Sequence, residues 1–384
     1  MNERAPIRTL HVDIEGGWGG SSRSLFELIR NLDPAIIKPI VAHRQEGPIT
    51  ERYAEIGVQT YHVPEIGSFA PRPKGSGKIF IASLPKLSRL RQANRKLGAI
   101  ARQHETQLAH LNYEGLFLLA RSLRQSTGLP LVCHSRTHIP ENHWGRWMVQ
   151  RLSREVMHMF FISTQEEERF RALEKGPPLP GEVMWNIAPE PLVRKELSDP
   201  PDVVYLGSLD YAKGTDRLIE IAAALRELDA PPLRIIVYGE ARMDPGIATA
   251  LRARVNKLGL DGRIEFAGHT SHPERVLSRA FALVRPSRSN DPWGRDLIEA
   301  ARAGVPSLAT GTFGGVIQHG KTGFLFPDYD PRDIAQQLVN LRQNPKFWRK
   351  MSQDAARSAA QKFGGQVQAE QFTRAVRGIV RGGN

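Results

Sequence analysis

The sequence of 384 residues contains a single cysteine and no long uninterrupted hydrophobic run. The lone Cys133 excludes a disulfide within the chain and a zinc site built from cysteines, and it fits a reducing cytoplasm. No segment approaches the apolar length that a membrane crossing needs, and the N-terminus lacks the apolar core of a cleavable signal. We therefore expect a cytoplasmic protein without a membrane-spanning segment.

Acidic residues are scarce relative to basic ones. Lysine and arginine together number 53 against 40 aspartates and glutamates, which gives a net charge of +13. Such an excess is typical of proteins that bind nucleic acid, but the chain has no zinc-finger spacing, no RNP motif and no helix-turn-helix signature. We therefore expect no nucleic-acid partner, and the basic charge requires another explanation.

No acid at all occurs between Arg72 and Gln103, a segment that contains nine lysines and arginines. Within it, leucine and alanine recur at helical spacing from Leu84 to Leu97. A basic helix with one apolar stripe either lies on an anionic membrane, here through Arg72–Arg102, or packs the stripe on its own sheet. The first interpretation makes the protein peripheral on the inner membrane face, and the sequence leaves both interpretations open.

The composition is otherwise that of a globular protein, with 40% hydrophobic and 24% charged residues. A chain of this length exceeds what one hydrophobic core usually serves, so two domains are expected. Short apolar strands alternate with helical segments in both halves, which predicts an α/β protein with two doubly wound, Rossmann-like sheets. The proline-rich stretch Asp199–Pro201 follows the first half. We place the two domains at residues 1–192 and 193–363.

The segment from Phe281 to Gly315 is the most informative part of the chain. An apolar strand is expected at Phe281–Val284, a helix from Gly294, and a further strand at Val305–Ala309. In such a βαβ unit the loop at the carboxyl end of the strand faces the ligand, and the amides at the helix start favour phosphate. Asp291, in the loop, and Glu299, in the helix, flank this expected phosphate site.

Two other loops also follow predicted strands. The loop Gly207–Gly214 comes after an apolar strand at Asp202–Leu206 and carries Lys213. The loop Asp13–Ser22 follows a strand near the N-terminus and contains four glycines, which allow close approach of a ligand. This second loop lacks the glycine spacing of the dinucleotide fingerprint, so by itself it is compatible with a nucleotide site or a tight turn.

These motifs resemble those of the retaining glycosyltransferases of family 4, which have the two-domain GT-B fold. That family carries Glu-x7-Glu followed by Glu-Ala-x-Ala-x-Gly-x-Pro, and this chain has Asp291-x7-Glu299 followed by the residues Ala300 to Pro306. The resemblance implies an acceptor-binding first domain, a nucleotide-sugar-binding second domain, and a C-terminal helix at residues 364–384 that returns to the first domain. It also implies a nucleotide-diphosphate sugar as donor and a saccharide or lipid-linked acceptor.

The resemblance assigns roles to individual residues. Glu299 is expected to bind the ribose hydroxyls and Asp291 the donor sugar. Lys213 is expected to neutralise the diphosphate, and Ser208 stands where the family has an arginine, a loss for which Arg295 compensates. The expected catalytic residues are Asp291, His134 and Lys213, and the expected donor-binding residues are Gly19, Gly20, Ser208, Lys213, Asp291, Gly294, Arg295 and Glu299.

The expected reaction transfers a glycosyl group to a hydroxyl with retention of configuration. Helix amides near Gly294 and Arg295, together with Lys213, stabilise the departing nucleotide diphosphate, so neither a metal nor another cofactor is expected. Two alternatives stay open. One is a GT-B sugar-nucleotide epimerase or phosphorylase, and the other is a non-enzymatic basic protein that binds membrane or nucleic-acid surfaces.

Overall fold

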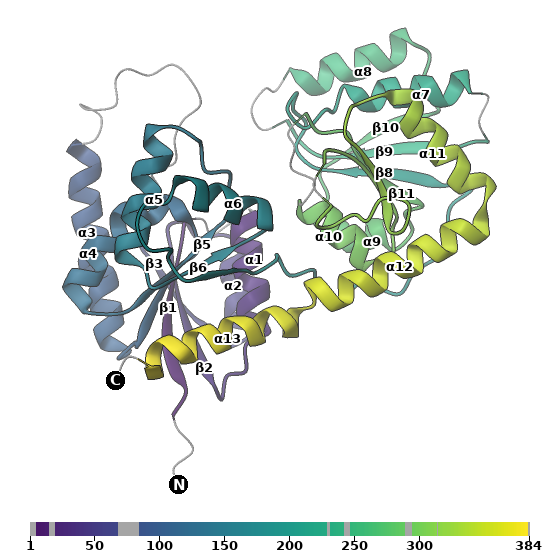
Figure 1. Cartoon of the computed structure of the whole chain (residues 1–384). Coiled ribbons are helices and arrows are strands. Elements are labelled where there is room, and N and C mark those ends of the chain that lie inside the picture. Colours follow the sequence, from purple (N-terminus) through teal and green to yellow (C-terminus); the bar gives the residue numbers. More distant parts are fainter. Residues whose placement is uncertain are drawn as a thin grey trace. The chain divides into compact units, whose positions relative to one another are not determined.

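The computed structural model describes residues 5–14, 20–67, 84–228, 231–241, 246–288, 294–312 and 314–382, with side chains from residue 87 onward in the helix that begins at Leu84. The chain forms two compact units (Figure 1). Unit 1 comprises residues 1–187 and 365–384, and unit 2 comprises residues 188–364. The boundaries expected from the sequence were 192/193 and 363/364. Gly19 and Asp291 lie outside the described residues.

Unit 1 contains a parallel sheet with the strand order β3-β2-β1-β4-β5-β6-β7. Its described strands are β1 (Ile7–Asp13), β2 (Ile37–His43), β3 (Gln59–His62), β4 (Leu108–Leu111), β5 (Leu131–Ser135), β6 (His158–Phe161) and β7 (Gly181–Val183). The chain moves outward from β1 to β3 and then crosses back to β4 on the other side of β1. The order therefore reverses between β1 and β4, and ligands of such sheets bind at the carboxyl ends of the strands beside this point.

Helices cover both faces of this sheet. One face carries α3 (Leu84–Gln103), α4 (Phe117–Thr127), α5 (His143–Glu155) and α6 (Thr164–Leu173), which share one hydrophobic core. The other face carries α1 (Gly20–Arg30), α2 (Pro48–Glu55) and α13 (Gly365–Gly382), which share a second core. A short 3-10 helix at Glu114–Leu116 precedes α4. The C-terminal helix α13 is thus part of unit 1, where Phe372 is fully buried.

The apolar stripe of α3 packs on its own sheet over most of its length. Ala93 and Leu97 are fully buried in the core of unit 1, and Leu90 is partly buried against it. Leu87, near the start of the helix, remains 51% exposed. Packing on the sheet, one of the two interpretations left open by the sequence, therefore accounts for the C-terminal part of the stripe.

Unit 2 contains a second parallel sheet, with the order β10-β9-β8-β11-β12-β13. Its described strands are β8 (Asp202–Leu206), β9 (Arg234–Tyr238), β10 (Ile264–Gly268), β11 (Ala282–Arg285), β12 (Ser307–Thr310) and β13 (Gly323–Phe326). Its described helices are α7 (Arg217–Glu227), α8 (Ile247–Lys257), α9 (Pro273–Leu277), α10 (Arg295–Arg302), α11 (Pro331–Gln343) and α12 (Pro345–Phe363). The strand order reverses between β8 and β11. Two Rossmann-like doubly wound sheets confirm the expected fold class.

The βαβ unit of β11, α10 and β12 begins and ends close to the predicted positions. Gly304 follows the last turn of α10 with φ of +68°, the left-handed conformation that glycine adopts most readily. The next strand starts at Ser307. The two loops singled out in the second half of the sequence therefore follow β8 and β11, the neighbouring strands at which the order of this sheet reverses.

Candidate functional site

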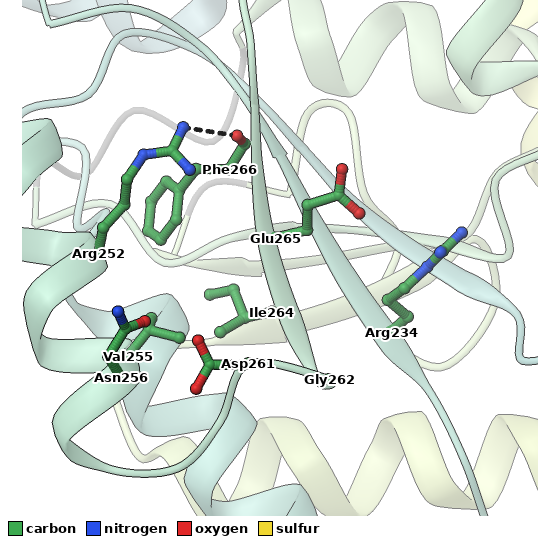
Figure 2. A pocket seen from close by; sticks show the side chains of 9 residues that line it. All are labelled: Arg234, Arg252, Val255, Asn256, Asp261, Gly262, Ile264, Glu265 and Phe266. Atoms are coloured by element: carbon green, nitrogen blue, oxygen red, sulfur yellow. Dashed lines mark hydrogen bonds between the residues drawn. The ribbon is translucent and has the colours of Figure 1, made fainter.

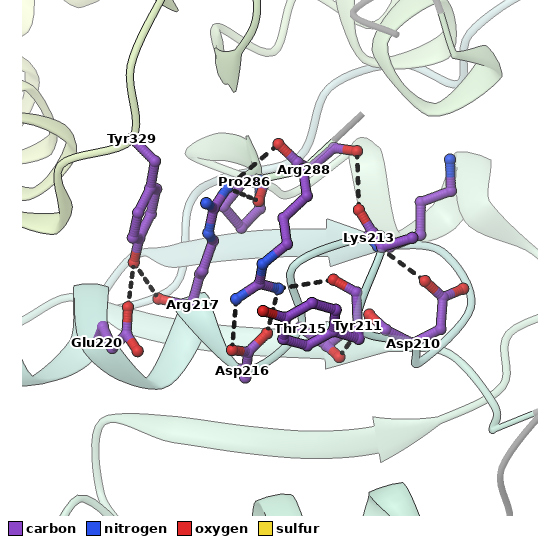
Figure 3. A network of polar contacts seen from close by, with 12 residues as sticks. Asp210, Tyr211, Lys213, Thr215, Asp216, Arg217, Glu220, Pro286, Arg288 and Tyr329 are labelled. Atoms are coloured by element: carbon purple, nitrogen blue, oxygen red, sulfur yellow. Dashed lines mark hydrogen bonds and ion pairs between the residues drawn. The ribbon is translucent and has the colours of Figure 1, made fainter. Parts of the chain in front are cut away.

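The loops that follow β8 and β11 in unit 2 are held against each other (Figure 3). The backbone amide of Arg288 donates to the carbonyl oxygen of Ala212 at 2.8 Å, and the Ser287 hydroxyl donates to the same oxygen at 3.2 Å. At Gly214, φ is +71° and a Cβ atom would lie 2.0 Å from the carbonyl oxygen of Pro286. A residue without a side chain is therefore required where the first loop crosses the second.

An arginine–aspartate pair fixes the same crossing. Arg288 donates to both carboxylate oxygens of Asp216, each at 2.8 Å, and its guanidinium carbon lies 3.6 Å from the centre of the Tyr211 ring. The hydrogen bond from Arg288 lowers the pKa of Asp216. Because a forked guanidinium matches a carboxylate in both position and plane, this contact fixes the orientation of the two loops.

A second arginine contacts the same loop from the start of α7. Arg217 donates to the carbonyl oxygens of Pro286 and Ser287 at 3.2 and 3.3 Å, and its guanidinium carbon lies 4.0 Å from the centre of the Tyr329 ring (Figure 3). The Tyr329 hydroxyl lies 2.9 Å from a carboxylate oxygen of Glu220. Burial, and then this hydrogen bond, raise the pKa of Tyr329. The loop after β11 is thus held both by the loop after β8 and by Arg217 at the start of α7.

Lys213 occupies a loop whose shape is set by Asp210. The carboxylate of Asp210 accepts from the backbone amide of Lys213 at 2.7 Å and from the hydroxyl of Ser208 at 2.6 Å. The Lys213 side chain extends from the loop away from that carboxylate (Figure 3). Ser208 therefore shapes the loop through Asp210, and the half-buried Lys213 supplies a cation at the carboxyl edge of the sheet.

The start of α10 is fixed to the end of β11. Arg285, the last residue of β11, forms an ion pair with Asp296 in the first turn of α10, and both side chains are largely buried. A Cβ atom at Gly294, the N-cap residue, would lie 2.0 Å from a guanidinium nitrogen of Arg285. Since Arg285 contacts α10 and the next residue, Pro286, contacts Gly214, the helix start and the Lys213 loop are joined through two consecutive residues.

Arg295 and Glu299 form an ion pair one turn apart on α10. The guanidinium of Arg295 donates to a carboxylate oxygen of Glu299 at 2.9 Å, and Glu299 is 7% exposed. Glu299 borders a cavity of about 20 Å³ together with Pro189, Pro191 and Leu277. This cavity has room for about one water molecule and is too small for a ribose.

The carboxyl edge of unit 1 contains a buried polar network around Arg136. The guanidinium of Arg136 donates to the side-chain oxygen of Asn112 at 2.8 Å and to that of Asn186 at 3.0 Å. Asn112 in turn donates to a carboxylate oxygen of Asp13 at 3.0 Å. Asp13 ends β1, Asn112 follows β4 and Arg136 follows β5, so the network spans the point at which this sheet reverses its strand order.

Two buried glutamates extend the network. Glu114 accepts from the backbone amide of Arg136 at 2.6 Å and from the hydroxyl of Thr137. Burial raises the pKa of Glu114 to about 7, although both hydrogen bonds oppose the rise. Glu166 lies 2.5 Å from Nδ1 of His138, whose side chain is half exposed. This edge therefore presents a histidine–carboxylate pair beside a carboxyl group that ionises near neutral pH.

Two family models match the chain, one to each half. The model described as a glycosyl transferase 4-like domain matches residues 19–186, and the model for glycosyl transferases group 1 matches residues 191–358. Among solved structures, Anabaena Alr3699/HepE in complex with UDP and glucose superposes with a TM-score of 0.76 at 18% identity, over 96% of this chain and 99% of that one. Sucrose-phosphate synthase from Thermosynechococcus elongatus superposes with a TM-score of 0.74 at 17% identity, over 98% and 100%.

The chain belongs to the GT-B glycosyltransferases. A curated relative, glycogen synthase from Mycobacterium tuberculosis, is 33% identical over 39% of this chain and 35% of its own length. Mannosylfructose-phosphate synthase from Agrobacterium fabrum is 27% identical over 42% and 37%. The chain thus spans about a third of the length of these curated relatives.

In this GT-B glycosyltransferase the residues predicted from the sequence fall into three groups. Ser208 and Lys213 lie together on the loop after β8, and Gly294, Arg295 and Glu299 lie together at α10. The third group, Gly20 and His134, belongs to unit 1, where Gly20 starts α1 and is exposed while His134 lies inside the unit.

His134 is fully buried, and not at the surface as a substrate contact requires. Its Nδ1 atom lies 2.6 Å from His110, and His110 lies 2.9 Å from His11, so three rings follow one another across β5, β4 and β1. The Phe160 ring stacks on His134, and burial lowers the histidine pKa well below its usual range. We therefore give His134 no catalytic role in the function proposed below.

Asp13, Asn112 and Glu114 were not predicted from the sequence as residues of the unit 1 edge. Their position in the sequence could have identified them, because Asp13 ends one strand and Asn112 directly follows another. Polar residues at the carboxyl ends of parallel strands are candidates for ligand contacts. In contrast, Arg295 and Glu299 were both predicted as donor-binding residues, and their i, i+4 spacing places them on the same side of α10.

A surface cavity of about 410 Å³ lies at the opposite edge of the unit 2 sheet (Figure 2). Arg234 and Ile264, which begin β9 and β10, line it together with Arg252 from α8. Figure 2 shows Arg252 donating to the carbonyl oxygen of Phe266, at 2.7 Å. Arg234 pairs with Asp202. Both cations bond to the protein itself, and the amino ends of parallel strands are not where such sheets bind nucleotides.

Within the described parts of both units, no group of three or more histidine, cysteine, aspartate or glutamate side chains could hold a metal ion. Among the described helices, none is long and apolar enough to cross a membrane.

Proposed function

We propose that the protein transfers a glycosyl group from a nucleotide-diphosphate sugar to an acceptor hydroxyl. The observation that carries the proposal is the carboxyl edge of unit 2. There, the Lys213 loop and the start of α10 are joined through Arg285 and Pro286 at the point where the strand order reverses. A helix start and a lysine at this position form a site for a diphosphate. The structural neighbours from Anabaena, which were solved with UDP and with UDP-glucose, support a donor of this class.

Charge stabilisation of the leaving group is the main catalytic contribution in this proposal. As the bond to the sugar breaks, negative charge grows on the diphosphate. Lys213 and the amides at the start of α10 stabilise that charge, and Arg295 adds to it once a ligand competes for its contact with Glu299. Because these groups come from the protein, we propose that the reaction requires no metal. Gly19, Gly20 and Asp291 remain proposed donor contacts.

Glu299 is the proposed ribose ligand. Its carboxylate is oriented by Arg295, which donates to it at 2.9 Å. Carboxylates that accept from vicinal hydroxyls lose binding when replaced by an amide, since hydrogen bonds to a charged group are about twice as strong as neutral ones.

We further propose that transfer retains the anomeric configuration and that the acceptor is a glycan, a lipid-linked glycan or a small molecule. The names of the relatives, which include a glycogen synthase and an N-acetyl-alpha-D-glucosaminyl L-malate synthase, support hydroxyl acceptors of several kinds. Nuclear magnetic resonance of the product tests retention. Inversion at the anomeric carbon would contradict this part of the proposal and leave the donor site intact.

The donor site is tested by thermal shift with UDP, GDP and ADP. One nucleotide should raise the melting temperature, because a ligand that binds only the folded state stabilises it. The shift should disappear in Glu299→Gln and fall in Lys213→Met. The controls are Glu227→Gln and Lys257→Met, which change exposed residues of the same types on α7 and α8.

Nucleotide release then separates the classes of enzyme. With the preferred donor and a panel of acceptors, Lys213→Met should lower kcat/KM about 10²-fold to 10³-fold, the range found when one preorganised donor to a developing anion is removed. Donor epimerisation without an acceptor, or release that depends on inorganic phosphate, would favour the epimerase or phosphorylase alternative. An unchanged melting temperature with every nucleotide would contradict the proposed function.

A further inference from the structure

Three neighbouring helices of unit 1, α3, α4 and α5, form one side of the unit. The Ser126 hydroxyl of α4 lies 3.3 Å from the side-chain oxygen of Asn94 on α3, and Arg124 of α4 donates to the carbonyl oxygen of Arg154 on α5 at 3.0 Å. All three helices bury their apolar sides in the same core. Their outer sides therefore make one continuous surface, which we call the α3–α5 face.

The charge of the α3–α5 face is almost entirely of one sign. The three helices contain eleven lysines and arginines and a single acid, Glu155. Unit 1 as a whole has a net charge of +9 in the sequence, whereas these helices alone sum to +10. The exposed basic side chains of the face are Arg89, Arg91, Arg95, Lys96, Arg102, Arg121, Arg124, Arg146 and Arg154. Of these, Lys96 pairs with Glu65 at 2.6 Å.

Apolar side chains are exposed at one end of this face. Leu87, near the start of α3, is 51% exposed, and Trp147, near the start of α5, is 40% exposed. The Trp147 ring lies 5.1 Å from Trp144 and 4.9 Å from Phe117, the first residue of α4. Since each helix connects parallel strands, all three begin at the carboxyl edge of the sheet. The exposed leucine and tryptophan therefore lie at the edge that holds the Arg136 network.

We propose that the α3–α5 face docks on an anionic lipid bilayer, with Trp147 and Leu87 at the level of the headgroups. Basic side chains with tryptophan and leucine at one margin are the combination that anionic membrane surfaces attract. Docking holds the carboxyl edge of unit 1 at the bilayer, where the hydroxyl of a lipid-linked acceptor is presented. This choice of acceptor rests on the proposed function, whereas docking itself does not.

The packing of α3 implies that docking is mainly electrostatic. Ala93 and Leu97 are buried in the core of unit 1, so the helix cannot insert that stripe into lipid while the unit stays folded. Binding consequently depends on surface charge with few apolar anchors. Attraction of that kind is screened by salt and falls off within a Debye length.

The experiment is co-sedimentation of the full chain with vesicles of phosphatidylcholine alone or mixed with phosphatidylglycerol. We expect binding to the anionic vesicles only, and its loss as the salt concentration rises. The triple change Arg89→Gln, Arg91→Gln and Arg95→Gln should weaken binding about a hundredfold, given the contribution of each basic residue near a charged surface. Trp147→Ser should weaken it several-fold, while Trp147→Phe retains most of the binding.

The matched control changes three exposed basic residues of unit 2, Arg332→Gln, Lys350→Gln and Arg357→Gln, which removes the same charge elsewhere. This control should bind as the unaltered protein does. Equal binding to both kinds of vesicle, or an equal loss in the two triple variants, would overturn the proposal. Binding of a mixed-sequence oligonucleotide without vesicle binding would assign the face to nucleic acid instead.

The same variants separate docking from the donor site. The nucleotide-induced thermal shift should be unchanged in the triple variant of α3, because its residues lie outside the proposed donor site of unit 2. Loss of vesicle binding with an intact nucleotide shift supports docking as a separate property. A nucleotide shift without any vesicle binding would overturn docking and leave the proposed function standing.

Discussion

The carboxyl edges of the two sheets are stabilised in different ways. In unit 1, residues that end or follow β1, β4 and β5 form a network around Arg136, which is 9% exposed. In unit 2, the loops after β8 and β11 are held by backbone contacts and by the Arg288–Asp216 pair, whose side chains are about one quarter exposed. Buried polar groups cost far more when a partner is lost than exposed ones do. Loss of Arg136 from the unit 1 edge should therefore cost more free energy than loss of Arg288 from the unit 2 edge.

The largest effect is expected at the centre of the unit 1 edge. Arg136→Met removes the donors to two buried acceptors, the side-chain oxygens of Asn112 and Asn186. We expect the free energy of unfolding of unit 1 to fall by at least about 3 kcal/mol. Hydrogen exchange of the amides of β1, β4 and β5 measures this loss separately from unit 2. Exchange in those strands that stays as slow as in the unaltered protein would show that Arg136 is not the centre of the network.

The free energy of unfolding of unit 1 should depend on pH because Glu114 ionises near neutral pH only in the folded state. Its folded pKa, about 7, lies above that of an unfolded glutamate, so its contribution to stability is full below about pH 4.3 and is lost as pH rises through 7. The loss across this window is on the order of 3 kcal/mol. Glu114→Gln should remove that part of the pH dependence, as followed by hydrogen exchange between pH 4 and 8. An identical pH profile in the variant would contradict the raised pKa.

A pair of glycine variants tests the crossing of loops in unit 2. Gly214 and Gly259 both have positive φ, but only at Gly214 would a Cβ atom meet backbone. Gly259→Ala should cost about 1 kcal/mol, the ordinary penalty of the left-handed conformation. Gly214→Ala should cost about 2 kcal/mol or more and abolish the nucleotide-induced thermal shift, because the loops must separate. Equal costs and equal nucleotide shifts would show that the close approach to Pro286 does not matter.

The smallest effect is expected at Arg288, the unit 2 counterpart of Arg136. Arg288→Met should lower the free energy of unfolding by about 1 kcal/mol, since the pair with Asp216 is partly exposed. The lowered pKa of Asp216 means that this contribution is present above pH 3.9 and is lost as pH falls through the folded pKa. Urea unfolding at neutral and acid pH measures it. A loss as large as that of Arg136→Met would remove the difference between the two edges.

The fold and the unit 2 edge were largely predictable because their signals are local. The βαβ unit of β11, α10 and β12 follows from strand, helix and glycine signals within 35 consecutive residues, and Gly304, directly after α10, adopts the left-handed conformation typical of a residue that ends a helix. Lys213 and Ser208 were predicted on the loop after β8, where both lie. Local spacing also places Arg295 and Glu299 one turn apart on the same helix.

The contacts within the unit 1 edge could not be predicted because they depend on strand order and on distant packing. Arg136 bonds to Asn112 only because β4 and β5 are neighbours in the sheet. It also bonds to Asn186, which lies 50 residues later in the sequence. His134 was expected to contact a substrate because the family that the chain resembles has a histidine there. His134 is instead covered by His110 and by the ring of Phe160. Phe160 in turn packs on Phe372 of α13, a helix more than two hundred residues away in the sequence.

Hydrogen exchange with and without the preferred nucleoside diphosphate tests the central claim most directly. We predict that the ligand slows exchange in residues 207–214 and 294–300, the Lys213 loop and the start of α10, and leaves β10 unchanged. The protection should be absent in Lys213→Met and Glu299→Gln and present in Lys257→Met. Protection confined to the cavity between α8 and β10, or to no part of unit 2, would contradict the assignment of this edge as the donor site.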